Sequence, residues 1–248
     1  MNEYLSGFIL GLCQGLTEFL PVSSSGHLVL LESMGVGEPD LMTNLLLHLA
    51  TLIAVLCVYG KKIIYLIKHP LDERMRFLLL ASAVTAVPAG IIRYFLPQNV
   101  EWLPLCFIAT SVILVLPHII KPKQSSFSDK WAAKAIFVGL AQGLACINGI
   151  SRSGTTVTAM RLAGADDDES ADMAFLLAIP IIIAGSGVEA LTQTRSNPIN
   201  GGIILGMVVA FIVGIIAIKS FVALLKKKKM YVFSVYTFIL GIATFFIM

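Results

Sequence analysis

The chain has 248 residues, of which 57% are hydrophobic and only 13% are charged, and its formal net charge is +3. Its mean hydropathy of +0.87 is too high for a water-soluble domain, because so few polar groups could not cover the apolar surface. The composition therefore excludes soluble enzymes and soluble binding modules and predicts an integral membrane protein. The small positive charge does not indicate a nucleic-acid partner, and we expect the basic loops to meet anionic lipid headgroups.

Six apolar stretches are long enough to cross a membrane. Each is close to the roughly 20 residues that a helix needs to span the hydrocarbon core. In chain order they lie at 42–60, 77–97, 101–120, 171–192, 201–225 and 231–248. The sequence therefore predicts an all-α polytopic membrane protein in which residues 1–248 form a single membrane domain.

The beginning of the chain occurs a second time. Residues 11–26 align with residues 139–154 without a gap, and half of the aligned positions are identical. The sequence therefore predicts two repeats, residues 1–120 and residues 131–248. The identical pairs are Gly11/Gly139, Leu12/Leu140, Gln14/Gln142, Gly15/Gly143, Leu16/Leu144, Ser23/Ser151, Ser25/Ser153 and Gly26/Gly154.

Lysine and arginine are concentrated in three loops, which predicts the orientation of the chain. By the positive-inside rule these loops are cytoplasmic, so we expect a multi-pass protein of the plasma membrane with both termini outside. The basic residues of the three loops are Lys61, Lys62, Lys68, Arg74 and Arg76, then Lys121, Lys123, Lys130 and Lys134, and finally Lys226 to Lys229.

Two segments, residues 4–31 and 131–163, must enter and leave on one side if this charge pattern is to hold. We expect each to be a re-entrant helical hairpin, because Gly, Ser and Pro dominate the tips and irregular backbone at membrane depth must be buried in protein or face water. Each repeat then has one hairpin and three transmembrane helices. Three is an odd number, so the second repeat is inverted relative to the first. We expect the tips to meet at a polar cavity near the membrane midplane.

Arg152 is the cation of the second hairpin tip. Its planar guanidinium is flanked by serine hydroxyls and precedes residues that can open a helix with exposed amides, a donor set that suits phosphate oxygens. An ion pair between Arg152 and Glu18 that only locks the hairpins together is the alternative, since buried charges are normally paired. The predicted substrate-binding residues of this tip are Ser151, Ser153, Gly154 and Thr155.

The first hairpin tip carries a histidine, a glutamate and three serines. His27 could take a proton from a serine or from water, or it could bond a backbone carbonyl. One of Ser23, Ser24 and Ser25 could be a nucleophile, and the others would cap helices. Glu18 could bind a divalent cation, orient a catalytic histidine or neutralise the arginine.

Two other polar features are predicted to be structural. His48 lies in the apolar run LLLHLATLIAV, where packing or a hydrogen bond between helices is as plausible as a place in the cavity wall. We expect it to stand behind the groups that touch substrate. The acidic run 166–169 is expected to be a solvated cap of the following helix and no metal site.

The segments GLTEFLPVSSSGH (15–27) and GISRSGTT (149–156) resemble the two signature motifs of the undecaprenyl-pyrophosphate phosphatase (BacA) family. The resemblance extends over the whole length of the chain. It implies an integral membrane enzyme that hydrolyses a C55 polyisoprenyl pyrophosphate to the monophosphate and phosphate. It also places the active cavity on the outer side of the membrane, in agreement with the first hairpin entering from outside. Such an enzyme recycles the carrier lipid of surface glycan assembly and confers resistance to bacitracin.

The resemblance also assigns roles to individual residues. It implies the catalytic residues Ser24, His27, Glu18 and Arg152, with Ser25 as a second hydroxyl. His27 would deprotonate Ser24, or a water, for attack on the terminal phosphorus, while Glu18 orients the histidine or helps to bind Mg²⁺ or Ca²⁺.

Two positions depart from the family pattern. Gln14 replaces a first glutamate, so a divalent-cation site built on two glutamates lacks one ligand charge here. A symmetric structural role is the alternative for Gln14, because Gln142 is its equivalent in the second repeat. Asn148 stands where the family has proline.

Another class of function shares the predicted architecture. Inverted repeats with re-entrant hairpins are typical of secondary transporters, so a polyisoprenyl-phosphate flippase or transporter is the alternative reading. The lipid and the membrane are the expected partners, and a homodimer is one assembly compatible with the sequence. Phosphate release from the lipid by purified protein would distinguish hydrolysis from transport.

Overall fold

The computed structural model describes residues 2–37, 40–95, 100–192 and 199–247, and every regular element in these ranges is a helix. The elements are α1 (Glu3–Thr17), α2 (Ser24–Ser33), α3 (Leu41–Lys68), α4 (Glu73–Phe95), the 3₁₀ turn η1 (Val100–Trp102), α5 (Leu103–Ile120), α6 (Trp131–Leu144), α7 (Arg152–Leu162), α8 (Asp167–Thr192), α9 (Gly201–Lys226) and α10 (Met230–Ile247).

Six of the helices are long and apolar enough to cross a membrane, which confirms the predicted polytopic class. The candidate spans are Leu41–Lys68, Glu73–Phe95, Val100–Ile120, Asp167–Val188, Gly201–Lys226 and Met230–Ile247. Each overlaps one predicted stretch. The predicted ends at residues 97 and 248 lie outside the described residues. Helix α8 begins at Asp167, before the predicted apolar stretch 171–192. Its first turn is acidic, and acidic side chains stabilise a helix N-terminus.

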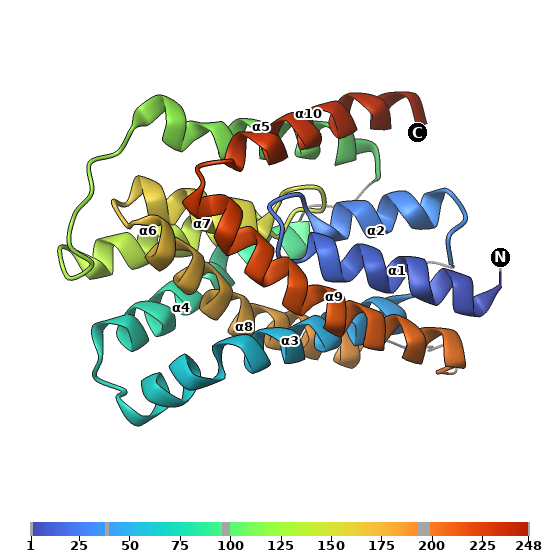
Figure 1. Cartoon of the computed structure of the whole chain (residues 1–248), viewed down its shortest axis with the longest axis horizontal. Coiled ribbons are helices and arrows are strands. Elements are labelled where there is room, and N and C mark those ends of the chain that lie inside the picture. Colours follow the sequence, from blue (N-terminus) through green and yellow to red (C-terminus); the bar gives the residue numbers. More distant parts are fainter. Residues whose placement is uncertain (1, 38–39, 96–99, 193–198, 248) are drawn as a thin grey trace.

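The remaining four helices are short and form two pairs, α1 with α2 and α6 with α7. In Figure 1 both chain ends lie at one end of the bundle, and the connections α3–α4 and α5–α6 lie at the other. The two short pairs therefore lie within a frame of long helices.

Helix α1 packs against α9 at very short range because both helices present small residues every fourth position. A Cβ atom added to Gly7 would lie 1.9 Å from the carbonyl oxygen of Gly202, and one added to Gly11 would lie 2.2 Å from that of Gly206. The glycines therefore allow backbone to touch backbone, and this contact fixes the depth of α1 beside α9.

The equivalent contact in the second half joins α6 to α4. A Cβ atom on Gly139 would lie 2.5 Å from the carbonyl oxygen of Ala81, and one on Gly143 would lie 2.2 Å from a ring carbon of Pro88. The hydroxyl of Thr85 donates to the carbonyl oxygen of Gly139 at 3.0 Å. Each short pair is thus held by a long helix from the other half of the chain.

The aromatic centre of the main apolar core is Phe175 on α8. Its ring contacts Phe19, Tyr59 and Phe221 at centroid distances of 5.8, 5.7 and 5.7 Å. These rings come from the loop after α1 and from helices α3 and α9. Phe175 therefore joins α8 to both halves and supports the loop that follows α1.

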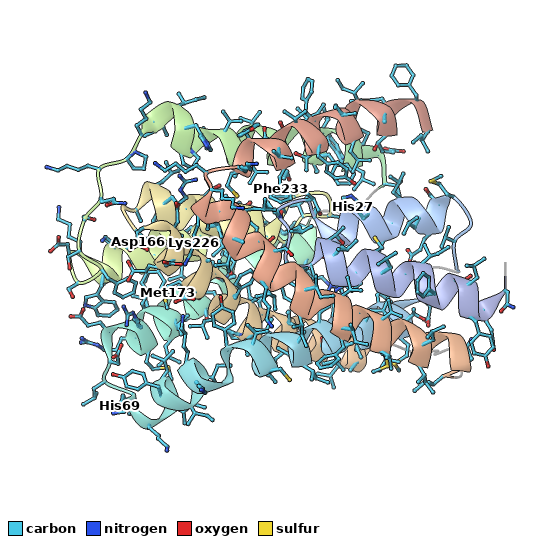
Figure 2. The ribbon with its side chains drawn as sticks, viewed as in Figure 1. His27, His69, Asp166, Met173, Lys226 and Phe233 are labelled. Carbon is cyan, nitrogen blue, oxygen red and sulfur yellow. The ribbon has the colours of Figure 1, made fainter. Side chains whose placement is uncertain are left out.

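The acidic first turn of α8 is paired with basic side chains of neighbouring helices. Lys226 contacts Asp168 at 2.7 Å, and Arg161 contacts Asp167 at 3.2 Å. Figure 2 shows Asp166 and Lys226 toward the end of the bundle opposite the two termini. Asp166 caps α8 by accepting from the amide of Glu169 at 2.8 Å, and the two ion pairs anchor the first turn.

Candidate active site

The two short helix pairs meet at a cavity of about 200 Å³. The loop after α1 and the start of α2 form one side, and the turn between α6 and α7 forms the other. Helices α3 and α8 complete the wall. The lining residues are Thr17, Glu18, Ser23, Ser24, Ser25, His48, Ala145, Cys146, Asn148, Ile150, Ser151, Arg152, Ser153, Ile181, Ile182, Gly185 and Ser186.

Glu18 is the central group of this cavity. Its side chain is only 1% exposed and forms an ion pair through Oε1 with Nη2 of Arg152. Its other oxygen, Oε2, accepts hydrogen bonds from the Ser24 hydroxyl at 2.6 Å and from the Gln14 amide at 3.0 Å. A carboxylate buried this deeply needs such partners, since an unpaired charge in a membrane interior is costly.

Ser24 is the serine whose hydroxyl is linked to this carboxylate. A hydrogen bond of 2.6 Å to a carboxylate oxygen is in the range of charge-assisted O–H donors. The neighbouring Ser25 lines the same cavity, but its hydroxyl lies 3.5 Å from that of Ser23. Among the three serines of the first tip, the geometry therefore singles out Ser24 as the hydroxyl with an adjacent base.

The two tips are built alike. Ser23 caps α2 by accepting from the amide of Gly26 at 3.3 Å, and Ser151 caps α7 by accepting from the amide of Gly154 at 3.1 Å. Ser23 has φ +70°, a left-handed backbone that a non-glycine residue rarely adopts. Both helix N-termini thus begin at the cavity wall, and helix N-termini present free amides and a positive dipole end to anions.

The glycines of the two tips let the two short helix pairs approach one another. A Cβ atom on Gly26 would lie 3.0 Å from the Cα of Gly149, and one on Gly154 would lie 3.0 Å from the Cβ of Pro21. The hydroxyl of Ser153 crosses the interface and donates to the carbonyl oxygen of Leu20 at 3.0 Å. Gly154 therefore serves close packing, which brings the polar residues of both tips to one cavity.

The predicted binding residues Ser151, Ser153 and Thr155 of the second tip are buried. The Ser151 and Ser153 hydroxyls lie 3.3 Å apart at the cavity wall. Thr155 is 8% exposed, and its hydroxyl has no hydrogen-bond partner among the described residues. Nη1 of Arg152 is likewise buried without a partner in this part of the chain. Arg152 therefore keeps donor capacity beyond its pair with Glu18.

His27 does not line the cavity. Its Nδ1 lies 2.7 Å from the carbonyl oxygen of Ser23, and its Nε2 lies 2.7 Å from the hydroxyl of Tyr236. The ring stacks on Tyr236 and meets Phe107 edge-on. Both ring nitrogens have hydrogen-bond partners, so in this arrangement the histidine holds the Ser23 backbone and joins α2 to α10. A bond to a backbone carbonyl was the alternative that the sequence offered for His27.

His48 is the histidine that does line the cavity. Its Nε2 lies 3.6 Å from Oε2 of Glu18, and its Nδ1 lies 2.7 Å from the carbonyl oxygen of Asn44, one turn earlier on α3. The Nδ1 proton is therefore directed at the backbone, and Nε2 faces the carboxylate. The sequence signal was a histidine inside an apolar span, which also fits a packing role.

Gln14 lies behind Glu18 and does not line the cavity. Its Nε2 is 3.5 Å from the Thr51 hydroxyl on α3, and its Oε1 is buried without a partner among the described residues. Gln142, its equivalent in the second repeat, contacts the hydroxyls of Thr85 at 3.2 Å and Thr156 at 3.3 Å. The two amides thus occupy comparable buried positions behind the two tips.

The donor set of the cavity does not suit a divalent cation held by the protein alone. Within the described ranges, no three His, Cys, Asp or Glu side chains gather as a group. Glu18 is the carboxylate at the cavity, and a guanidinium already neutralises it. Mg²⁺ and Ca²⁺ prefer several oxygen ligands, so a resident cation does not fit these residues.

The fold and this cavity define a class: a polytopic membrane protein with a carboxylate, an arginine and a serine hydroxyl at the meeting point of two helix N-termini. The model of the bacitracin resistance protein BacA family matches residues 7–243. The chain belongs to the BacA family.

Curated relatives match over nearly their full length. The chain is 37% identical to the undecaprenyl-diphosphatase of Carboxydothermus hydrogenoformans, covering 98% of this chain and 96% of the relative. It is 34% identical to the undecaprenyl-diphosphatase of Halothermothrix orenii, covering 97% of this chain and 96% of that protein. The undecaprenyl-diphosphatase of Treponema denticola is also 34% identical, covering 94% of this chain and 93% of that protein.

Proposed function

We propose that this protein hydrolyses undecaprenyl diphosphate to the monophosphate and inorganic phosphate in the cell membrane. Membership of the BacA family and full-length similarity to several undecaprenyl-diphosphatases support this function. The observation that carries it is the Ser24 hydroxyl, which donates to Glu18 at 2.6 Å beside Arg152. Hydrolysis would return the carrier lipid to surface glycan assembly and deprive bacitracin of the diphosphate that it sequesters.

The cavity suits nucleophilic attack by Ser24. The Ser24 oxygen forms a bond to the terminal phosphorus while the bond between that phosphorus and the bridging oxygen breaks. Glu18 takes the hydroxyl proton, and the lipid monophosphate leaves. Water then attacks the phosphoserine, and inorganic phosphate leaves as the Ser24 hydroxyl forms again.

Arg152 and the helix N-termini of the two tips stabilise the phosphoryl charge. The Nη1 atom of Arg152 has unused donor capacity, and the first amides of α2 and α7 begin at the cavity wall. Preorganised donors of this kind act most strongly where water is excluded. The hydroxyls of Ser25, Ser151 and Ser153, which line the cavity, are the proposed further contacts to substrate oxygens. The predicted contact of Thr155 stays a prediction, because this residue does not line the cavity.

The roles of the two histidines follow from their contacts. The predicted role of His27 as general base stays a prediction, and the geometry supports Glu18 more directly because His27 already bonds the Ser23 carbonyl and Tyr236. We propose that His27 positions the tip that carries Ser24. His48 is proposed to position Glu18, whose Oε2 it faces at 3.6 Å.

A divalent cation is proposed to enter with the substrate. Diphosphate oxygens can supply the ligands that the protein lacks, as is common for Mg²⁺ bound with few carboxylates. Glu18 is the residue that would contact such a cation, and Gln14 would only orient Glu18. The chemistry supplied would be neutralisation of phosphate charge.

The two short helix pairs are proposed to be re-entrant hairpins of two inverted repeats, residues 1–120 and 131–248. Helices α1 and α2 have 15 and 10 residues, and α6 and α7 have 14 and 11, fewer than the roughly 20 required to cross. The matched contacts of α1 with α9 and of α6 with α4 support a twofold relation.

The cavity is proposed to face outside, with both termini on that side. Figure 1 supports this orientation, because the basic connections α3–α4 and α5–α6 lie at the end of the bundle opposite both termini. A homodimer stays a prediction, which crosslinking in native membranes would test. Membrane-impermeant labelling of tags at the two termini would test the orientation.

Phosphate release is the deciding measurement. Purified wild-type protein in detergent should release phosphate from undecaprenyl diphosphate, and Ser24→Ala should not. Ser33→Ala, at the other end of α2 and outside the cavity lining, should retain release as a control. A flippase is the second candidate, because paired hairpins also occur in transporters. Correctly folded protein that moves the lipid across proteoliposomes without releasing phosphate would replace the hydrolase proposal with transport.

A further inference from the structure

The cavity has one polar wall and one apolar wall. Glu18, Ser24 and Arg152 lie on the polar wall, whereas Ile181 and Ile182 of α8 line the other. The volume of about 200 Å³ is below the roughly 300–1,000 Å³ of pockets that enclose drug-sized ligands. The cavity can thus accept a diphosphate headgroup, but a long prenyl tail must continue beyond it.

Helix α8 changes its environment at the apolar wall. Ile182 and Ser186, one turn apart on the cavity side, are 5% and 9% exposed, whereas Ile183, Ala184, Gly185 and Gly187 are all exposed. This change lies inside the candidate span Asp167–Val188. The exposed surface of α8 at this depth therefore faces lipid.

Gly185 belongs to both environments, because it lines the cavity and is exposed. A Cβ atom at this position would meet no heavy atom within 4 Å. The missing side chain consequently serves neither close helix packing nor a left-handed backbone. It leaves an open rim where the cavity meets the lipid-facing surface.

We propose that Gly185, together with Ile181 and Ile182, forms a lateral opening through which the first isoprene units of the substrate leave the cavity. This inference rests on the proposed function and names the route of the tail. An apolar chain attached to a diphosphate matches this order of surfaces, with polar donors first, then isoleucine side chains, then lipid. The opening would accept branched hydrocarbon chains and exclude bulky polar substituents near the diphosphate.

The chain offers a closely matched control. Gly187 lies on the same helix, is also exposed, and a Cβ atom there also meets no heavy atom within 4 Å, but it does not line the cavity. Gly185→Leu should lower kcat/KM for undecaprenyl diphosphate by roughly 10-fold or more, as steric mismatches in apolar pockets do. Gly187→Leu should leave it within about twofold.

Substrates with tails of different length separate the tail from the headgroup. Relative to wild type, Gly185→Leu should lose less activity with a five-carbon prenyl diphosphate than with fifteen-carbon or undecaprenyl substrates. An equal loss at every length, or equal behaviour of the Gly185→Leu and Gly187→Leu proteins, would overturn the inference.

A second readout is independent of hydrolysis. A prenyl diphosphate that carries a diazirine in its first isoprene units should label the wild-type protein at residues 181–185. Labelling there without phosphate release would retain the tail route and sink the proposed function. Phosphate release with labels confined to other helices would retain the proposed function and overturn the tail route.

Discussion

Arg152 of α7 and Glu18 at the end of α1, 134 residues apart in the sequence, form an ion pair that joins the tips of the two short helix pairs. Glu18 is buried and Arg152 is half-buried, with side-chain exposures of 1% and 16%. The pair therefore contributes both to the assembly of the tips and to the charge of the cavity.

The two contributions can be separated by substitution. Arg152→Met should lower the unfolding free energy by about 3–5 kcal/mol, because it leaves the Glu18 carboxylate buried without its cation. Adding Glu18→Gln should recover most of this stability, since the remaining amide is neutral, while activity stays lost. Thermal unfolding in detergent and phosphate release measure the two effects. Equal stability of the single and double variants would contradict the ion-pair account.

The hydrogen bond between Ser24 and Glu18 predicts a difference between neighbouring serines. Removing either the Ser24 hydroxyl or the Glu18 carboxylate should reduce kcat by at least about 10²-fold, the lower range for a lost general base. Ser23→Ala should instead cost about 1 kcal/mol of stability through the lost cap of α2. Phosphate release and melting temperature should thus move independently. Unchanged release by the Ser24→Ala protein would point to water as the nucleophile.

The contact between His27 and Tyr236 distinguishes a positioning histidine from a general base. Tyr236→Phe removes the partner of Nε2 and should lower stability by about 1–3 kcal/mol, because a buried ring nitrogen loses its hydrogen bond. If His27 positions the tip, kcat should fall or stay constant. A rise in kcat would show that the tyrosine restrains a catalytic base. Steady-state kinetics of purified protein would decide between the roles.

The close contact of α1 with α9 predicts which glycines are irreplaceable. Gly11→Ala should destabilise the protein by at least about 1–3 kcal/mol, because its Cβ would overlap the carbonyl oxygen of Gly206. Gly60→Ala on α3 is the control, because a Cβ there meets nothing within 4 Å. It should be neutral or stabilise by about 0.5–1 kcal/mol. Similar melting temperatures for the two variants would rule out the proposed backbone contact.

The donor set of the cavity predicts how divalent cations act. If the cation enters with the diphosphate, EDTA should lower activity without lowering the melting temperature of the substrate-free protein. Added Mg²⁺ should then lower the apparent KM for undecaprenyl diphosphate. A melting temperature that falls on addition of EDTA would instead indicate a resident cation, which binds the folded state and stabilises it.

The local sequence pattern was sufficient to predict the membrane-spanning helices and part of the candidate site. The six spans are confirmed because bilayer thickness demands long apolar stretches wherever the chain crosses. Glu18, Ser24 and Arg152 also share one cavity, as expected from two copies of one motif with complementary charges. The motif encodes the turn after each short helix, and serine caps and small residues suffice to form it.

The places of the two histidines depended on the tertiary structure. His27 follows the serine tip directly, yet its ring turns to Tyr236, 209 residues later in the chain. His48 faces Glu18 because of the rotation of α3 about its axis, which packing against α8 and α9 sets. An apolar span looks alike on every face in sequence, so its rotation is decided by contacts with distant helices. The sequence by itself determined the spans and the chemistry of the tips, and packing decided which side chains complete the cavity.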